Sequence, residues 1–250
     1  MNTNTNNDRT LPTVDRARSE AWFLAETVLG MNATCVLHGP AGTGKTYAAA
    51  TIARPGSPVP VVMTMTDETS AADLLGHYIA GPNGFEWKDG PAVLAMRAGA
   101  RLVINEIDHA SGDAIAALYA IADERDTLAR TGVALGNGEH VFPAAGFHVV
   151  ATSNAEPADA LRGEGIASRF ALRVHLPDAH PAAVDALPED CRKAAAASCI
   201  NPDPEQRLTL RSWRIFADLR HQIGQPLAAA LAFGPGRADA ITDSLAVAAA

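Results

Sequence analysis

The sequence predicts an α/β protein built on a parallel sheet, followed by a smaller helical domain. Three observations support this prediction. Short apolar runs of strand length recur between helix-permitting stretches up to about residue 176. One run leads into a glycine-rich loop at 39–46, and another, at 102–108, delivers acidic residues at its C-terminal end, where a parallel sheet places its ligand chemistry. After Pro177 only helical stretches remain, broken by proline and glycine.

Composition limits the class of protein. At 250 residues the chain is long enough for one large domain, or for a core domain with a small appendage, and its hydrophobic content of 48% is that of a globular protein. A formal net charge of -8 gives no basic footprint for general nucleic-acid binding, although a local basic channel stays open. Three cysteines, Cys35, Cys191 and Cys199, lie too irregularly for a disulfide framework or a zinc site, so we expect a reducing, cytoplasmic setting.

The beginning of the chain has no targeting pattern. Residues 1–8 are rich in Asn and Thr and lack an apolar core, so we expect a disordered arm at 1–13 and neither a signal peptide nor a membrane anchor. No run of 18 apolar residues occurs, and the alanine-rich stretch at 246–250 is too short to span a bilayer.

The glycine-rich loop fits the phosphate-binding pattern G-x-x-x-x-G-K-[ST] at every fixed position. An apolar run at 34–37 precedes it and an alanine-rich stretch at 47–52 follows, which is the strand-then-helix context of a nucleotide site; an accidental glycine-rich turn is the alternative. Glycines let backbone N–H groups turn toward a β-phosphate, and the opening helix directs its unpaired amides to the same anion. Lys45 can reach the β- and γ-phosphates, and Thr46 can ligate Mg²⁺. The residues expected to bind the nucleotide are Gly39, Pro40, Ala41, Gly42, Thr43, Gly44, Lys45 and Thr46.

Four further elements surround this loop in the first part of the chain. Residues 14–29 have the spacing of an amphipathic helix that ends at Gly30. The apolar run 59–63 predicts a second strand. Two short arms around Gly-Pro-Asn-Gly predict a hairpin at 78–87, and a helix-permitting stretch follows at 92–97.

The run 102–108 is the second chemical landmark, because it reads as a buried strand that delivers acids at its end. Glu106 can orient and deprotonate the water that attacks a γ-phosphate. Asn105 stands where an aspartate is expected; its amide oxygen can face Mg²⁺ but brings no charge, which puts metal affinity and turnover in doubt. We expect Asp108 to be a structural or helix N-terminal residue. A plain strand end followed by a solvated acidic turn is the alternative.

The middle of the chain supplies the remaining strands. Residues 114–122 have helical spacing explained by core packing, and two arms around Gly-Asn-Gly predict a second hairpin at 132–142. A buried strand at 147–152 leads to Asn154, whose amide can come within reach of the γ-phosphate; a turn-forming role is the alternative. The segment 161–170 contains Arg162 and Arg169, and a fifth strand is expected at 172–176.

The helical stretch that begins after Pro177 contains one unusual arginine. Thr209 can cap a helix with Arg211 in its first turn, where a cation opposes the helix dipole, so helix stability does not explain Arg211; a surface arginine is the alternative. The eight histidines show no metal-ligand spacing, and we expect each to be a packed or solvated residue.

With these residues laid out, residues 20–235 resemble an AAA+ ATPase of the MoxR and cobaltochelatase small-subunit branch. Members of that branch carry a hairpin inserted in their second helix and another before the first sensor, and residues 76–90 and 132–143 match those insertions by position. The resemblance implies a P-loop NTPase αβα sandwich with a five-stranded parallel sheet of order 5-1-4-3-2 and a small C-terminal helical lid. The expected divisions are an arm at 1–13, a nucleotide-binding domain at 14–176 and the lid at 177–250.

The resemblance also implies roles for three polar residues. Asn154 matches the first sensor, Arg211 matches the second sensor on the lid, and Arg169 matches the arginine finger that reaches a neighbouring subunit's site. Arg162 is the second candidate for the finger, and a plain surface arginine is the third interpretation. Asn105 is the one departure that matters.

The function implied is that of a ring-forming ATPase, hexameric by family habit, that uses ATP and Mg²⁺ to remodel a protein partner. Members of the family commonly act as chaperones with a partner that carries a von Willebrand factor A domain. Two alternatives stay open: a switch that binds ATP with little hydrolysis, favoured by Asn105, and a DNA-directed loader, against which the acidic balance weighs. A GTPase is disfavoured because no Asn-Lys-x-Asp motif is present.

Overall fold

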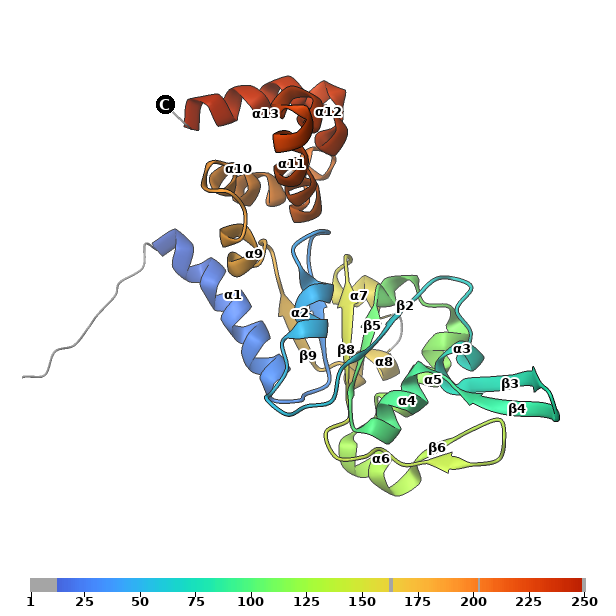
Figure 1. Cartoon of the computed structure of the whole chain (residues 1–250). Helices are drawn as coiled ribbons and strands as arrows, with labels where there is room; N and C mark the ends of the chain where they lie inside the picture. The colour runs from blue at the N-terminus through green and yellow to red at the C-terminus, as the bar shows by residue number, and fades with distance from the viewer. Residues whose placement is uncertain (1–12, 162–163, 202, 249–250) are drawn as a thin grey trace, which may run out of the picture.

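The structure is a computed structural model that describes residues 13–161, 164–201 and 203–248 (Figure 1). The arm expected at 1–13 therefore lies outside the described residues, apart from Thr13, where helix α1 (Thr13–Gly30) begins. Arg162 also lies outside them.

Five parallel strands form the central sheet. They are β1 (Cys35–His38), β2 (Val61–Thr64), β5 (Arg101–Asn105), β8 (His148–Ser153) and β9 (Leu172–His175). Their order in the sheet is β2-β5-β8-β1-β9. Counted along the chain this is the predicted order 5-1-4-3-2, which is confirmed. Because β8 lies between β1 and β5, the three strands that end in predicted site residues are neighbours.

Alternate residues of the central strands pack into two different cores, so helices cover both faces. On one face, Cys35 and Leu37 pack with residues of α1 and of α2 (Lys45–Thr51). On the other, Val36 packs with α4 (Pro91–Ala98), α5 (Gly112–Ile121) and α8 (Glu164–Arg169). The expected αβα sandwich is therefore present (Figure 1).

Both hairpins predicted from their glycine-containing turns are present. Strands β3 (Gly76–Gly81) and β4 (Gly84–Asp89) form the longer one, with Tyr78 opposite Trp87. Strands β6 (Val133–Ala134) and β7 (His140–Val141) form the shorter one. In Figure 1 the longer hairpin extends away from the sheet on the side opposite α1.

Some elements differ from those expected. Helix α3 (Ala71–Leu75) was not predicted, although Ser70 and Asp73 form a complete capping box at its start. Helix α6 (Arg125–Thr131) was not predicted either. The segment around 161–170 contains two short helices, α7 (Pro157–Ala160) and α8, and a 3₁₀ turn η1 (Ile107–His109) follows β5.

The chain after β9 is helical, as predicted. Its elements are α9 (Pro181–Asp185), α10 (Glu189–Cys199), η2 (Pro204–Gln206), α11 (Leu210–Ile223), α12 (Gln225–Phe233) and α13 (Pro235–Ala248). They pack around their own core, in which the rings of Trp213 and Phe233 are 4.8 Å apart and those of Phe216 and Phe233 are 5.3 Å apart. Within the described ranges, no helix combines the length and the apolar character that crossing a bilayer requires.

Candidate nucleotide site

The glycine-rich loop connects β1 to α2 and packs closely against two distant segments. Gly39 has φ of 138°, and a Cβ atom there would lie 2.3 Å from the carbonyl oxygen of Leu176, just after β9. Gly42 has φ of 78°, and a Cβ atom there would lie 2.5 Å from Cβ of Thr209, the residue that caps α11. Only glycine suits both positions, because an L side chain would be strained and would also collide. The first helix turn of α11 therefore begins directly against the loop.

The side chain of Lys45 is buried within the curve of this loop. Its Nζ donates hydrogen bonds to the carbonyl oxygens of Gly39 (2.8 Å) and Pro40 (2.7 Å) and to Oδ1 of Asn154 (3.0 Å). Burial lowers the pKa of Lys45 to about 8, and the charges of Asp108 and Glu106 oppose that shift. The amine is thus held by uncharged oxygens with two carboxylates nearby. Thr43 stabilises the loop itself, because its hydroxyl donates to the carbonyl of Pro40 at 3.2 Å.

Asn105 connects the loop to three strands. Its Oδ1 accepts hydrogen bonds from the hydroxyls of Thr46 and of Thr152 (2.8 Å), and its Nδ2 donates to Oγ1 of Thr64 at 3.3 Å. The amide oxygen therefore faces the Thr46 hydroxyl, which is the predicted metal ligand. Thr64 and Thr152 were not identified from the sequence, where a threonine in a strand carries no specific signal.

Glu106 and Asp108 follow β5 in an unusual backbone turn. Glu106 has φ of 57° and ψ of 51°, the left-handed region that non-glycine residues rarely adopt, and its N–H donates to Oγ1 of Thr152 at 3.2 Å. In η1, Oδ1 of Asp108 is enclosed and has no hydrogen-bond partner among the described residues. Buried carboxylate oxygens normally have a partner, so this oxygen is an unused acceptor beside the loop, and the structural role expected of Asp108 stays a prediction.

Five of the predicted site residues thus meet at the carboxyl edge of the sheet. They are Lys45, Thr46, Asn105, Glu106 and Asn154. Pro40 and Ala41 lie at the loop tip, and Gly44 precedes α2 with φ of 103°. Parallel sheets bind ligands at this edge, and the arrangement offers one cation, two carboxylates and a hydroxyl to a polyanion with its metal.

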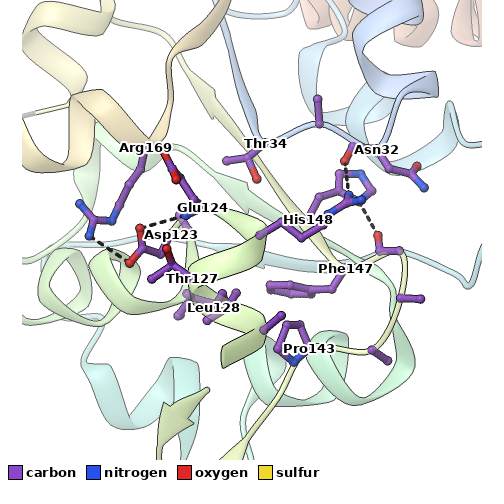
Figure 2. Close-up of a pocket in the computed structure, with 18 of the residues that line it drawn as sticks. Asn32, Thr34, Asp123, Glu124, Thr127, Leu128, Pro143, Phe147, His148 and Arg169 are labelled. Carbon is purple, nitrogen blue, oxygen red and sulfur yellow. Dashed lines mark hydrogen bonds and ion pairs between the residues drawn. The ribbon is translucent and has the colours of Figure 1, made fainter. Parts of the chain in front are cut away.

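Arg169 is the last residue of α8, and its contacts are with residues outside this cluster, among them Asp123 (Figure 2). Its guanidinium donates to the carbonyl oxygens of Tyr119 (2.6 Å) and Gly165 (3.1 Å), and it lies 3.4 Å from a carboxylate oxygen of Asp123. The side chain is 25% exposed. Any role on a neighbouring subunit requires Arg169 to release these contacts with its own chain.

Arg169 also lines a pocket of about 760 Å³, which Figure 2 shows from within. Thr34, which precedes β1, and Phe147 and His148, where β8 begins, form part of its wall. The pocket therefore lies at the amino edge of the sheet, opposite the phosphate-binding loop. We assign the nucleotide to the loop and not to this cavity, because parallel sheets bind ligands at their carboxyl ends.

Arg211 lies in the first turn of α11, two residues after Thr209, and its side chain is exposed. No hydrogen bond or ion pair of its guanidinium is present within the described part of the chain. Since Thr209 packs against Gly42, Arg211 begins near the loop with its charge uncommitted.

Comparison with known proteins bears on this site. A family model described as AAA domain (dynein-related subfamily) matches residues 34–170. NorQ of Paracoccus denitrificans is 38% identical over 122 residues, which cover 48% of this chain and 43% of NorQ. The denitrification regulatory protein NirQ of Pseudomonas aeruginosa is 36% identical over 102 residues, which cover 40% of this chain and 39% of NirQ. The matches thus span less than half the length of these curated relatives. The solved structure of NtrX from Brucella abortus is similar in fold alone, with a TM-score of 0.50 and 16% identity over 94% of this chain and 68% of that chain.

Proposed function

The chain belongs to the AAA domain family, in its dynein-related subfamily, and from that premise we propose that it hydrolyses ATP to remodel a protein partner. Family membership agrees with the resemblance drawn from the sequence and implies nucleotide binding with a metal ion, generally Mg²⁺. Hydrolysis, the client and the individual roles of the site residues are our proposals.

The observation that carries the proposal is the contact of Lys45 with Asn154, beside the contact of Thr46 with Asn105. These bonds join the phosphate-binding loop to the ends of the two strands expected to act on a γ-phosphate. The loop fits a polyphosphate, because Gly39 and Gly42 have no room for a side chain and Lys45 is positioned by carbonyls within the loop. The enclosed Oδ1 of Asp108 fits a nearby cation or its water shell.

We assign the steps to the chain's own groups. Lys45 donates to the β- and γ-phosphate oxygens, and Asn154 keeps its amide beside them. Glu106 orients the attacking water and accepts its proton. Thr46 and Asn105 would hold Mg²⁺, with Asp108 close by to supply the charge that Asn105 lacks. Mg²⁺ held there would offset the negative charge of the phosphate oxygens.

We further propose that the chain assembles into a homo-oligomeric, hexameric ring in which Arg169 acts on the neighbouring subunit's site and Arg211 acts from the lid. Rings are the usual assembly of AAA+ proteins. The division into a nucleotide-binding domain at 14–176 and a lid at 177–250 belongs to this proposal. The name of NirQ, a denitrification regulatory protein, is consistent with action on another protein. We propose a partner with a von Willebrand factor A domain and a cytoplasmic setting, the latter consistent with three free, buried cysteines.

A second candidate function is an ATP-dependent switch with little turnover. The observation that favours it is Asn105, an uncharged group that faces the Thr46 hydroxyl where a carboxylate would bind Mg²⁺ more strongly. A phosphate-release assay separates the two functions. Steady turnover supports the remodelling ATPase, whereas ATP binding with no turnover supports the switch.

The test of the proposed chemistry uses Glu106→Gln. We expect it to preserve ATP binding and to abolish phosphate release, because the amide cannot accept a proton from water. Glu68→Gln is the matched control, since Glu68 is an exposed acid on the loop between β2 and α3. Parental turnover in Glu106→Gln would show that another group activates the water.

The test of the ring mixes two inactive proteins, Arg169→Ala and Lys45→Ala. Mixed junctions can pair an intact loop with an intact Arg169, so partial ATPase activity should return. Arg169→Ala also removes contacts with Tyr119 and Asp123, and the thermal transition of the variant must therefore be measured beside its activity. A mixture that co-assembles but stays inactive would contradict action across the interface.

A further inference from the structure

Three potential metal ligands meet at the base of the phosphate-binding loop: His38, His175 and Glu156. His38 ends β1 and His175 ends β9, and the two are register partners in adjacent parallel strands, so their side chains leave the same face at the same level. Their rings stack with centroids 4.9 Å apart and an angle of 29° between planes. Glu156 caps α7, which follows β8 on the other side of β1. Two adjacent strands and the segment that follows a third thus contribute one ligand each.

The donor atoms are already near the spacing of a coordination sphere. One ligand atom from each residue lies within 4.8 Å of the other two. Nδ1 of His38 lies 3.5 Å from Oε2 of Glu156. Two ligands of one tetrahedral ion, each about 2.1 Å from it, are about 3.4 Å apart. The His38–Glu156 pair therefore matches this geometry, and the His175 donor, which lies within 4.8 Å of both, must move closer to complete it.

The Nδ1 atom of His38 also lacks a hydrogen-bond partner, although Oε2 of Glu156 lies 3.5 Å away. It is fully enclosed and accepts or donates no hydrogen bond among the described residues. Buried polar atoms are nearly always satisfied, so this nitrogen is a position that a bound ion would complete.

We propose that His38, His175 and Glu156 bind a divalent transition-metal ion of the Zn²⁺ class, separate from the Mg²⁺ of the nucleotide. Two imidazoles and one carboxylate suit Zn²⁺, Co²⁺, Ni²⁺ and Fe²⁺, whereas Mg²⁺ prefers an all-oxygen set. His175 is exposed and the Glu156 side chain is 67% exposed, so the ion enters from solvent and keeps one position for water.

Other charged groups set limits on this site. The charges of Lys45 and Arg173 act on His38 and oppose a cation, while Glu156 favours one. The cysteines do not compete, because burial raises the pKa of Cys35 to about 12 and those of Cys191 and Cys199 to about 11. Zinc bound near neutral pH therefore reports on histidine and carboxylate ligands.

The experiment titrates the full chain, free of any histidine tag and of nucleotide, with Zn²⁺ in excess Mg²⁺, by calorimetry. We expect one equivalent to bind. His175→Ala and Glu156→Gln should each weaken binding at least about tenfold, since loss of even an outer-shell partner costs about 10- to 100-fold. Both residues are exposed, and circular dichroism should show that both variants remain folded.

Matched controls replace exposed residues of the same types elsewhere, His140→Ala and Glu68→Gln, and should bind as the parent does. The absorption spectrum of bound Co²⁺ should show nitrogen and oxygen ligands without a thiolate band. Absent binding, or binding equally tight in His175→Ala, Glu156→Gln and the controls, would overturn the site. Because the titration contains no nucleotide, its failure would leave the proposed ATPase untouched.

Discussion

Two buried cations, Lys45 and Arg101, lie at opposite edges of the same sheet, and they differ in what their partners can do. Lys45 is 5% exposed and Arg101 is 3% exposed. Burial lowers the pKa of each. Each is held by uncharged acceptors: three oxygens around Lys45, and three carbonyls with one histidine nitrogen around Arg101.

The partners of Arg101 are the ends of two helices. It donates to the carbonyl of Leu29 at 2.7 Å in the last turn of α1, and to those of Ala49 (2.7 Å) and Ile52 at the end of α2. Helix ends leave such carbonyls without a partner inside the helix, so Arg101 has a structural role in which it satisfies them and joins the two helix ends. Lys45 instead lies in a loop beside two carboxylates, and its N–H groups can exchange their present acceptors for phosphate oxygens. A perturbed pKa therefore marks a functional site only when the partners can be exchanged.

The largest expected effect tests the exchangeable cation. In Lys45→Ala we expect ATP turnover to fall by about 10³-fold or more, roughly 4 kcal/mol, because the donor to the β- and γ-phosphates is lost. The fold should persist, since two of the three hydrogen bonds of Lys45 lie within its own loop and only the one to Asn154 reaches another segment. Phosphate release and ATP binding measure the first effect, and thermal unfolding measures the second. A folded Lys45→Ala protein with parental affinity and turnover would show that Lys45, like Arg101, does not act on the nucleotide.

The second prediction concerns Arg101→Met, which should lower the free energy of unfolding by about 3 to 4 kcal/mol because the helix-end carbonyls lose their donor inside the protein. Urea unfolding followed by circular dichroism measures the change. Arg101→Lys should recover only part of it, since a single ammonium cannot reproduce the planar fork. An unchanged midpoint in Arg101→Met would mean that water replaces the guanidinium at no cost.

The third prediction uses the histidine beside Arg101. Arginine only donates, so Nε2 of His148 accepts from Nε of Arg101 at 2.9 Å, and Nδ1 donates to the carbonyl of Gly146 at 2.8 Å. Burial lowers the pKa of His148 from its ordinary 6.5 to about 4. As pH falls from 6.5 to 4 the unfolded chain takes up a proton that the folded chain does not, and stability is lost over that range.

At about 1.4 kcal/mol per pKa unit, the loss attributable to His148 is on the order of 3 kcal/mol by pH 4. Urea unfolding at a series of pH values measures it. His148→Gln, which can still accept from Arg101 but does not titrate, should flatten the dependence. An equally steep loss in His148→Gln would assign the acid sensitivity to other groups.

The smallest expected effect concerns negative charge near Lys45, at the position proposed for Mg²⁺. Asn105→Asp should tighten Mg²⁺-ATP binding about fivefold, roughly 1 kcal/mol, by adding a charge where the Thr46 hydroxyl points. Asp108→Asn should weaken it by a similar factor if Asp108 already supplies that charge. Fluorescent-nucleotide titrations with and without Mg²⁺ measure both. Equal affinities in parent and both variants would show that neither group faces the metal.

Much of the fold could be predicted from the sequence because its signals are local. Apolar runs marked the strands, and Gly-Pro-Asn-Gly and Gly-Asn-Gly marked the hairpins. The sheet order came from the family resemblance and is confirmed. Helix α3 was missed although Ser70 and Asp73 carry its capping signal, and the 59–63 strand begins only at Val61, after Pro60, which cannot donate to a ladder.

The candidate site could be predicted from the sequence where a motif fixes its geometry. It could not be predicted where the partner of a side chain depends on residues that are distant in the sequence. The sequence around Arg169 does not show that its side chain binds Tyr119 and Asp123, because those contacts depend on where α5 and the residues after it lie in the fold. The enclosed oxygen of Asp108 depends on burial, which spacing does not show. His38 and His175 were set aside for lack of metal-ligand spacing, yet the predicted order places their strands side by side. A search of strand ends in that order, in place of linear spacing, would have found the pair.

Helix α1 makes contacts that connect it to several segments around the nucleotide site. Near its end the carbonyl of Leu29 is bound by Arg101, which also holds the end of α2. Further up, Trp22 donates to the carbonyl of Asp178 at 3.2 Å, and Glu26 lies 3.3 Å from His180, whose N–H donates to the carbonyl of Thr43 in the loop. The contacts made by Trp22 and Leu29 are thus separated by a continuous stretch of α1 about 10 Å long, at about 1.5 Å per residue. Asp178 and His180, which lead into the C-terminal helices, therefore contact both α1 and the loop, so we expect a displacement of those helices to shift α1 and the loop together.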